Sequence, residues 1–317
     1  MENVAAPTPG PRDVILRVEV AGICGSDLHG YRGLNGRRRP GTVMGHELSG
    51  TVEQVGPEVD RSWLGRGVTV NPILGCDHCP ACRSGNPQRC PSKALLGCVP
   101  EHPGAFAELV CVPASALLAW TGSGPLSWAA FTEPLAVGVH ATRAVSVSDA
   151  DVLVIGSGPI GIASALSARR QGARVTITVG DDLRRAVVLE LGLSPVARDA
   201  VPFEAEYDVV VDCVGTDESL ALAMAHTRVA GTVVVVGIAG AVAALPMGPL
   251  VQGERVVRGS AQYSRASFAD AAAWLSSSEL DVSALLGVPQ PLSHAPEIFA
   301  TWTDDPGRPV RSLLTPR

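Results

Sequence analysis

The amino-acid sequence predicts an α/β protein in which a β-rich part is followed by a parallel-sheet part. Short alternating apolar runs, broken by Gly and Pro, fill residues 12–120 and are typical of strands and turns. From residue 151 onward, compact Val- and Ile-rich runs alternate with helical segments, which indicates a parallel sheet covered on both faces. A last short strand near residues 311–314 is expected to pack back on the first part.

The elements are expected in a definite order. Strands in the β-rich part fall at residues 14–20, 48–55, 68–71 and 106–112. Glu133 and Pro134 open a helical stretch over 135–145, because Pro suits a first helical turn. The α/β part should contain strands at 151–155, 174–179, 207–213 and 231–237, separated by helices at 159–171, 183–191 and 218–229. Two more helices are expected at 268–275 and 295–301.

Length and composition limit the possible functions. The 317 residues allow about two domains, and a 46% apolar content can fill a large core. A formal charge of −6 and an aromatic content of 4% argue against a nucleic-acid partner. No apolar run approaches the roughly 18 residues of a membrane span, and the first residues do not resemble a secretory signal. Eight cysteines in so long a chain favour metal ligation in a reducing compartment, so a cytoplasmic protein is expected.

A Gly-rich turn follows the strand expected at 151–155. It reads Gly156, Ser157, Gly158, Pro159, Ile160, Gly161, and a helix is expected after it. The first Gly permits the tight turn, the second lets a pyrophosphate approach the backbone, and the third lets helix and strand pack closely. The helix N-terminus also attracts the anion. The pattern predicts dinucleotide binding, and the alternative is a turn that serves packing alone.

The next strand bears on the choice of dinucleotide. Val179 stands where an acidic residue usually binds the adenosine ribose. Asp181 or Asp182 could reach the ribose hydroxyls and would repel a 2′-phosphate, whereas Arg184 or Arg185 could attract one. The prediction is NAD, with NADP as the alternative. Both Asp residues have a simpler interpretation as caps of the helix that follows.

Four cysteines form a compact motif within residues 75–91. Cys76, Cys79, Cys82 and Cys90 are close enough in sequence for their thiolates to surround one tetrahedral Zn²⁺. A site with four Cys ligands has no open position, so this zinc is predicted to be structural. Redox chemistry or disulfide pairing is the alternative.

A second set of candidate ligands is dispersed along the chain. Cys24 follows the first expected strand, His46 and Glu47 precede the second, and Glu133 comes much later. Alone, a Cys is most often a core residue and a His is usually structural. Together, a thiolate, an imidazole and carboxylates form a mixed shell with room for water or substrate, which is typical of a catalytic zinc.

Taken together, these motifs resemble the zinc-dependent medium-chain dehydrogenase/reductase, or alcohol dehydrogenase, family. The similarity is greatest to the branch of sorbitol, threonine and butanediol dehydrogenases. The segments that carry it, besides the four-Cys motif, are CGSDLHGYRG at 24–33, GHELSG at 45–50, EPLAVGVHA at 133–141, GSGPIG at 156–161 and DCVGT at 212–216. The resemblance implies a GroES-like β-rich catalytic domain over 1–133 and 265–317, with a structural zinc lobe at 75–91. A Rossmann doubly wound parallel-sheet domain would occupy 134–264.

The resemblance also implies roles for the dispersed ligands. Cys24 and His46 would bind the catalytic zinc. Glu47 would be a ligand or an alternating near-ligand. Glu133 would be the fourth ligand or a hydrogen-bond partner of the water on the metal. Asp27 would hold the imidazole of His46.

Proton transfer and cofactor contacts follow from the same resemblance. Ser26 would accept the proton of the alcohol and pass it through the cofactor ribose to His29. The alternative is that both side chains only hydrogen-bond the loop. Val214 and Gly237 would line the dinucleotide site. Each chain would then bind two zinc ions, one catalytic and one structural.

The function implied is a zinc-dependent, NAD(P)-linked oxidoreductase. It would interconvert a secondary alcohol, on a polyol, cyclitol, amino sugar or amino alcohol, and its ketone. The alternatives are a carbonyl reductase in specialised biosynthesis of the aminoglycoside type, and a catalytically silent cofactor-binding member of the fold. A small-molecule alcohol or ketone is the expected substrate, in a homodimer or homotetramer with no nucleic-acid or membrane partner.

Overall fold

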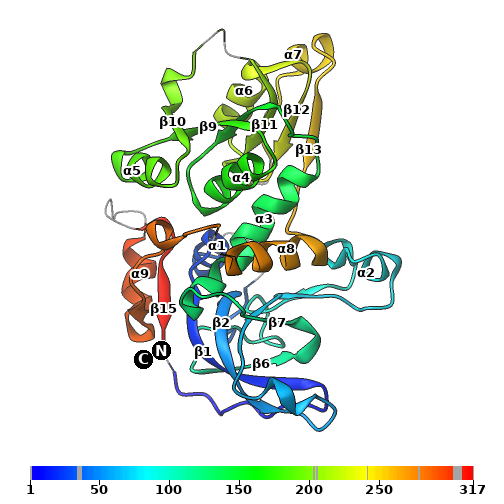
Figure 1. Ribbon diagram of the computed structural model, residues 1–317, viewed down its shortest axis with the longest axis vertical. Helices are drawn as coiled ribbons and strands as arrows, with labels where there is room; N and C mark the ends of the chain where they lie inside the picture. The colour runs from blue at the N-terminus through cyan, green and yellow to red at the C-terminus, as the bar shows by residue number, and fades with distance from the viewer. Residues whose placement is uncertain are drawn as a thin grey trace. The chain divides into compact units, whose positions relative to one another are not determined.

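The computed structural model describes residues 2–33, 38–202, 204, 206–240, 242–277, 279–302 and 309–316 (Figure 1). The chain divides into two compact units. One unit consists of Met1–Glu133 and Ser264–Arg317, and the other of Pro134–Tyr263. The second unit is therefore an insertion in the sequence of the first.

The first unit is built on a mostly antiparallel sheet. Within the described residues this sheet has seven strands, in the order β14-β15-β1-β2-β3-β7, with β6 also paired to β1. Ala21 pairs with Leu314, so the last strand does pack back on the first one. The strand bounds are β1 (Asp13–Gly22), β2 (Glu47–Val55), β3 (Gly67–Val70), β6 (Leu109–Pro113), β7 (Leu117–Ala119), β14 (Gln290–Pro291) and β15 (Leu313–Thr315).

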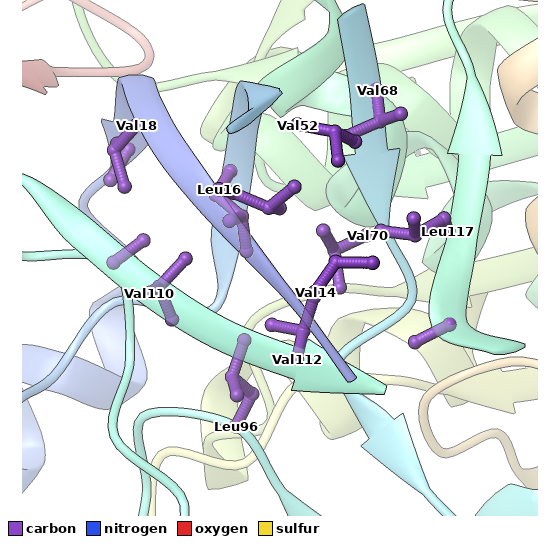
Figure 2. Close-up of a cluster of buried hydrophobic side chains, with 14 residues drawn as sticks. Val14, Leu16, Val18, Val52, Val68, Val70, Leu96, Val110, Val112 and Leu117 are labelled. Carbon is purple, nitrogen blue, oxygen red and sulfur yellow. The ribbon is translucent and has the colours of Figure 1, made fainter. Parts of the chain in front are cut away.

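The core of the first unit comes from the alternation of its strands. Val14, Leu16 and Val18 of β1 are buried together with Val110 and Val112 of β6 (Figure 2). Side chains two apart on a strand point to the same face, so this spacing produces one continuous apolar layer. Burying each such side chain contributes roughly 1.5–3 kcal/mol. The layer makes a stable base for the loops that leave the strand ends.

The first unit also contains short helices. They are α1 (Gly25–Tyr31), α2 (Pro80–Arg83), α8 (Arg265–Ser276) and α9 (Ala295–Thr301), and the pair β4 (Ile73–Leu74) and β5 (Ala94–Leu95) flanks the segment of the four-Cys motif. The sequence did not predict α1. Its first turn is closed by the Asp27 carboxylate, which accepts a hydrogen bond of 3.1 Å from the backbone N–H of Cys24. The start of α1 was missed because its N-cap residue is a cysteine, whereas the usual N-cap residues are Ser, Thr, Asp and Asn.

The second unit contains the predicted parallel sheet. Among its described residues six strands follow the order β10-β9-β8-β11-β12-β13, and all neighbours are parallel. The order reverses between β8 and β11, which is the switch point of a doubly wound fold. The strand bounds are β8 (Asp151–Ile155), β9 (Arg174–Val179), β10 (Ser194–Ala197), β11 (Tyr207–Asp212), β12 (Thr227–Val235) and β13 (Val256–Gly259).

Helices connect these strands. α4 packs against β8 and β9, and α6 packs against β11 and β12. Gly138 lets α3 approach α4 closely, because a Cβ there would collide with the backbone of Ala163. The helix bounds are α3 (Thr132–Arg143), α4 (Pro159–Arg170), α5 (Asp182–Glu190), α6 (Asp217–His226) and α7 (Met247–Gln252).

The structure corrects the sequence prediction near residue 227. The helix predicted at 218–229 ends at His226, and the strand predicted at 231–237 is β12, which already begins at Thr227. Thr227 pairs with Tyr207 of β11, so β-branched residues that extend the helical pattern belong to the sheet instead. The short edge strands β10 and β13 were not predicted either.

No helix in the described part of the chain is long and apolar enough to span a bilayer.

Candidate active site

Three of the dispersed candidate ligands meet in the first unit. The donor atoms of Cys24, His46 and Glu47 all lie within 4.8 Å of one another. Cys24 stands at the N-terminal cap of α1, while Glu47 is the first residue of β2 and His46 directly precedes it. Because β1 and β2 pair antiparallel with Gly22 opposite Glu47, the end of one strand meets the start of the other. The pairing explains how distant residues form one cluster.

Two glycines make room for this cluster. A Cβ at Gly22 would collide with the carboxylate of Glu47. Gly45 has φ +99°, a conformation that other residues rarely adopt, and a Cβ there would lie 2.7 Å from the ring of Phe106. The backbone on both sides of the cluster therefore depends on residues without a side chain.

Asp27 lies beside His46. Its Oδ1 is 3.4 Å from Nδ1 of His46, and the Asp27 side chain is fully buried. Burial alone would raise the pKa of Asp27, but the His46 ring and the Arg38 guanidinium lower it below its usual range. A carboxylate that accepted a hydrogen bond from this nitrogen would make the imidazole more basic and fix its orientation, so the other ring nitrogen would be a better metal ligand.

Glu47 has a buried cationic neighbour that the sequence did not reveal. Nη1 of Arg311 lies 3.2 Å from Oε1 of Glu47, and both side chains are buried. The same Nη1 donates a hydrogen bond of 2.5 Å to the carbonyl of Ile23. Burial raises the pKa of Glu47 despite the opposing charge of Arg311. The only hint in the sequence is one Arg before an apolar strand.

The fourth candidate ligand is not part of the cluster whose donor atoms lie within 4.8 Å of one another. Glu133 is buried in the first turn of α3, and its carboxylate is not among the donor atoms that form the cluster in the described structure. The structure thus brings together three of the four residues to which the sequence assigned the catalytic zinc.

The donor set of the cluster fits a zinc ion. A thiolate, an imidazole and a carboxylate are the ligand types that Zn²⁺ prefers, and three protein ligands leave one position for water or substrate. Neither carboxylate oxygen of Glu47 accepts a hydrogen bond of good geometry from the described residues, although both are buried and Oε1 is in ion-pair contact with Arg311. A buried carboxylate whose hydrogen-bonding capacity is not filled is costly, and a bound cation would satisfy it.

The two candidate proton carriers lie on α1. Ser26 and His29 are three residues apart, so they share one face of the helix. The Ser26 hydroxyl accepts a hydrogen bond of 3.2 Å from Nη2 of Arg38. His29 is exposed to solvent. Ser26 follows Cys24 by two residues in the first turn of α1, and His29 reaches water.

The four-Cys motif is a second cluster in the same unit. The Sγ atoms of Cys76, Cys79, Cys82 and Cys90 lie within 4.8 Å of one another. Backbone N–H groups of His78 and Cys79 lower the pKa of Cys76 to about 6, whereas burial raises the pKa of Cys82 to about 11. Four sulfur donors at these separations fit a tetrahedral zinc with no open position.

The segment of the four-Cys motif contacts α8, which is distant in sequence. The carbonyl of Gly85 accepts a hydrogen bond of 2.9 Å from the backbone N–H of Arg265, and the Arg265 guanidinium pairs with Asp77. All eight cysteines are free thiols, so the structure gives no support to disulfide pairing. Cys98, Cys111 and Cys213 lie outside both clusters.

The Gly-rich turn of the second unit has the geometry that its sequence predicts. Gly156 has φ +98°, and its N–H donates a hydrogen bond of 2.8 Å to Oγ1 of Thr178. A Cβ at Gly161 would collide with the carbonyl of Gly156, whereas a Cβ at Gly158 would meet nothing within 4 Å. Gly161 therefore serves packing inside the protein, and Gly158 keeps a surface of the turn open. This open surface fits a pyrophosphate at the N-terminus of α4.

The predicted residues of the neighbouring strand ends lie beside this turn. A Cβ on Gly156 would lie 2.8 Å from the side chain of Val214, and a Cβ on Gly237 would collide with the backbone of Val214. The Asp212 carboxylate accepts a hydrogen bond of 2.8 Å from the N–H of Val214 and holds that loop in place. Val214 and Gly237 thus stand with the Gly-rich turn at one end of the sheet.

Two of the residues that bear on the choice between NAD and NADP, Asp181 and Arg184, form hydrogen bonds within the protein. Val179 is buried at the end of β9. Asp181 is the N-cap of α5 and accepts a hydrogen bond of 2.7 Å from the backbone N–H of Arg184. Nη1 of Arg184 donates a hydrogen bond of 3.1 Å to the carbonyl of Ser157. The predicted capping role of Asp181 is confirmed, and Arg184 lies against the Gly-rich turn.

Comparisons with known proteins agree with this architecture. A model of the alcohol dehydrogenase GroES-like domain matches residues 10–121, and a model of zinc-binding dehydrogenases matches residues 159–277. L-idonate 5-dehydrogenase from Vitis vinifera is 32% identical over 299 residues, which are 88% of this chain and 81% of that protein. These matches confirm the predicted fold class of a GroES-like part with a Rossmann-type sheet.

Two solved structures superpose on nearly the whole chain. A zinc-binding dehydrogenase from Sinorhizobium meliloti 1021, bound to NADP, has a TM-score of 0.86 and 27% identity over 99% of this chain and 95% of its own. An alcohol dehydrogenase from Escherichia coli CFT073, complexed with NADH, has a TM-score of 0.86 and 26% identity over 98% of this chain and 93% of its own. With the two family models and the Vitis relative, they show that this chain belongs to the zinc-dependent medium-chain alcohol dehydrogenase family.

Proposed function

We propose that this protein oxidises a secondary alcohol to its ketone, with a catalytic zinc and with NAD as the hydride acceptor. The observation that carries the proposal is the cluster of Cys24, His46 and Glu47, whose donor atoms lie within 4.8 Å of one another. The same chain carries a Gly-rich turn whose open surface fits a pyrophosphate. One unit thus offers a site for a metal and the other a site for a dinucleotide.

The chain's own residues supply the binding and the proton path. Cys24, His46 and Glu47 would hold the metal, and Glu133 would serve it as an additional ligand or hydrogen-bond partner. When bound, zinc supplies a Lewis acid that lowers the pKa of a substrate hydroxyl. Ser26 would accept the hydroxyl proton, and His29 would release it to water. Asp27 would keep the imidazole of His46 in one orientation.

The proposal of NAD rests on charge around the end of β9. Asp181 and Asp182 follow this strand, and two carboxylates would repel the 2′-phosphate of NADP. Arg184 opposes them, but its guanidinium already donates a hydrogen bond to Ser157. One solved relative is bound to NADP and another to NADH, so membership of the family does not by itself fix the cofactor. We therefore base the preference for NAD on these side chains.

The proposed substrates are polyols, cyclitols, amino sugars and amino alcohols. L-idonate 5-dehydrogenase and sorbitol dehydrogenase, each 32% identical to this chain, support a polyhydroxylated substrate. L-threonine 3-dehydrogenase, 37% identical over 200 residues, supports an amino alcohol. The shared feature is a secondary hydroxyl beside a second polar group. Physiological flow in the reductive direction would use the same site.

A substrate panel tests the proposal. Purified protein would be assayed with sorbitol, idonate, threonine, butanediol and cyclitols, with NADH absorbance as the readout and zinc content measured in parallel. The expected result is oxidation of at least one class, with about two zinc ions per chain. A fully zinc-loaded protein that binds NAD but neither oxidises these alcohols nor reduces their ketones would favour a catalytically silent member instead.

The proposal also includes assembly and compartment. Homodimers or homotetramers in the cytoplasm are expected, with no nucleic-acid partner. Sedimentation of the purified protein at several concentrations would test the assembly, and a monomer at all of them would contradict it.

A further inference from the structure

A buried arginine lies beside the catalytic cluster. The Arg38 side chain is only 5% exposed, and its Nη2 lies 2.6 Å from Oδ1 of Asp27, which is 0% exposed. The same nitrogen donates the hydrogen bond of 3.2 Å to Oγ of Ser26. One nitrogen atom therefore holds two neighbouring residues of α1, one behind the ligand His46 and the other beside the ligand Cys24.

The helix is shaped to receive this side chain. Gly30 of α1 is buried, and a Cβ there would collide with Cδ of Arg38 and lie 2.9 Å from its Nε. Any other residue at this position would displace the guanidinium. The contact therefore depends both on Gly30 of α1 and on Arg38, which follows the helix in the sequence.

Charge explains why this position needs a cation. An imidazole that binds zinc through one nitrogen is neutral, so His46 can offer Asp27 a hydrogen-bond donor but no positive charge. A fully buried carboxylate without a full positive partner is strongly destabilised. Arg38 supplies that charge at hydrogen-bond distance. Without Arg38, the buried Asp27 carboxylate would lose its cationic partner, and its position beside His46 would be less well held.

We infer that Arg38 is a positioning residue that holds Asp27 against His46 and Ser26 beside Cys24. The inference rests on the proposed function, because it assigns Arg38 to the orientation of a zinc ligand and of the proposed proton acceptor. One guanidinium then links the geometry of the metal site to that of the proton path. Arg38 itself touches neither the metal nor the substrate in this role.

Three substitutions separate charge from shape. Arg38→Met removes the charge and both hydrogen bonds, Arg38→Gln keeps a donor without the charge, and Arg38→Lys keeps the charge. Because a single nitrogen makes both contacts, a lysine ammonium can replace them if it reaches. The matched control is Arg39→Met, since Arg39 is 58% exposed and pairs with Glu101 on the surface.

The readouts include one that is independent of activity. Holoenzyme variants would be compared by the rate at which a chromogenic chelator removes the more labile zinc, by the visible spectrum after cobalt exchange, and by kcat and KM. We expect Arg38→Met and Arg38→Gln to weaken zinc retention by about 10- to 100-fold. Their kcat should fall at least about tenfold, while KM for NAD stays within about twofold. Arg38→Lys should recover most of both losses, and Arg39→Met should match the parent.

Other outcomes overturn the inference. One is that Arg38→Met keeps zinc retention and kcat within twofold of the parent. Another is that Arg39→Met loses as much zinc retention and kcat as Arg38→Met. A third is that Arg38→Lys recovers neither zinc retention nor kcat. If even Arg38→Lys does not fold, Arg38 serves folding alone and the inference is wrong. A parent protein without dehydrogenase activity would contradict the proposed function, yet chelation and the cobalt spectrum would still report on Arg38.

Discussion

Nη1 of Arg311 lies 3.2 Å from Oε1 of Glu47, and the two residues come from opposite ends of the chain. The contact exists because β15 pairs with β1, which in turn pairs with β2, where Glu47 is the first residue. The C-terminal segment therefore contributes a buried charge to the metal cluster. A buried ion pair of this kind should have a measurable influence on stability.

Replacing Arg311 by Met should destabilise the fold by about 3 kcal/mol, because it leaves the Glu47 carboxylate buried without its partner. Urea unfolding would measure this loss. Burial already raises the pKa of Glu47, and loss of the cation would raise it further. A raised carboxyl pKa means that the folded state binds the extra proton, so stability falls as pH rises through that range. The loss should therefore be greater at pH 8 than at pH 5.

Arg12→Met is the control for this prediction. Arg12 pairs with Glu58, but both side chains are largely exposed, so its loss should cost less than about 1 kcal/mol. A similar cost for Arg311→Met, or the opposite pH trend, would show that the buried pair does not stabilise the cluster.

Zinc content should distinguish the cluster of Cys24, His46 and Glu47 from the four-Cys cluster. Cys24→Ala should lower zinc from two ions per chain to one and reduce turnover at least about 100-fold, while the melting temperature changes little. Cys90→Ser should also remove one zinc but lower the melting temperature by more than about 5 °C, because metal binding contributes to folding there. Cys111→Ser, outside both clusters, should retain both ions. Elemental analysis and calorimetry would check this, and two ions in Cys24→Ala would refute the catalytic assignment.

Two glycines of the dinucleotide turn should respond differently to Ala. A Cβ at Gly158 meets nothing within 4 Å, so Gly158→Ala should leave the unfolding free energy nearly unchanged. It should still raise the dinucleotide Kd about tenfold, because the methyl group occupies the pyrophosphate surface. A Cβ at Gly161 collides with Gly156, so Gly161→Ala should cost about 2 kcal/mol. Unchanged dinucleotide binding by Gly158→Ala in calorimetric titrations would contradict the assignment.

The cofactor preference should depend on the charge of Asp181. Asp181→Asn keeps a good helix cap but removes the carboxylate, so stability should be unchanged. The ratio of kcat/KM for NADP to that for NAD should rise about fivefold or more, since one repulsive charge is lost. Arg184→Met should lower the same ratio. A parent enzyme that prefers NADP would show that Arg184 outweighs the carboxylates.

Much of the fold follows from local sequence patterns. The apolar alternation of residues 14–20 and the compact run at 151–155 predicted β1 and β8, because side-chain direction repeats every two residues in a strand. The same local logic fails at Thr227, whose pairing with Tyr207 makes it part of β12 rather than of the helix before it. It also fails at α1, where a cysteine occupies the cap. At Thr227 a contact distant in sequence decides the structure, whereas at α1 a local cap of unusual residue type does.

The two metal clusters mark the boundary between what sequence and tertiary structure each determine. The sequence by itself determined the four-Cys motif and the Gly-rich turn, because their residues lie within one short segment and need little beyond local backbone geometry. Only the tertiary structure shows that the donor atoms of Cys24, His46 and Glu47 lie within 4.8 Å of one another. It alone revealed Arg38 and Arg311. A buried charge requires a partner within a few ångströms, and that requirement acts through space rather than along the chain.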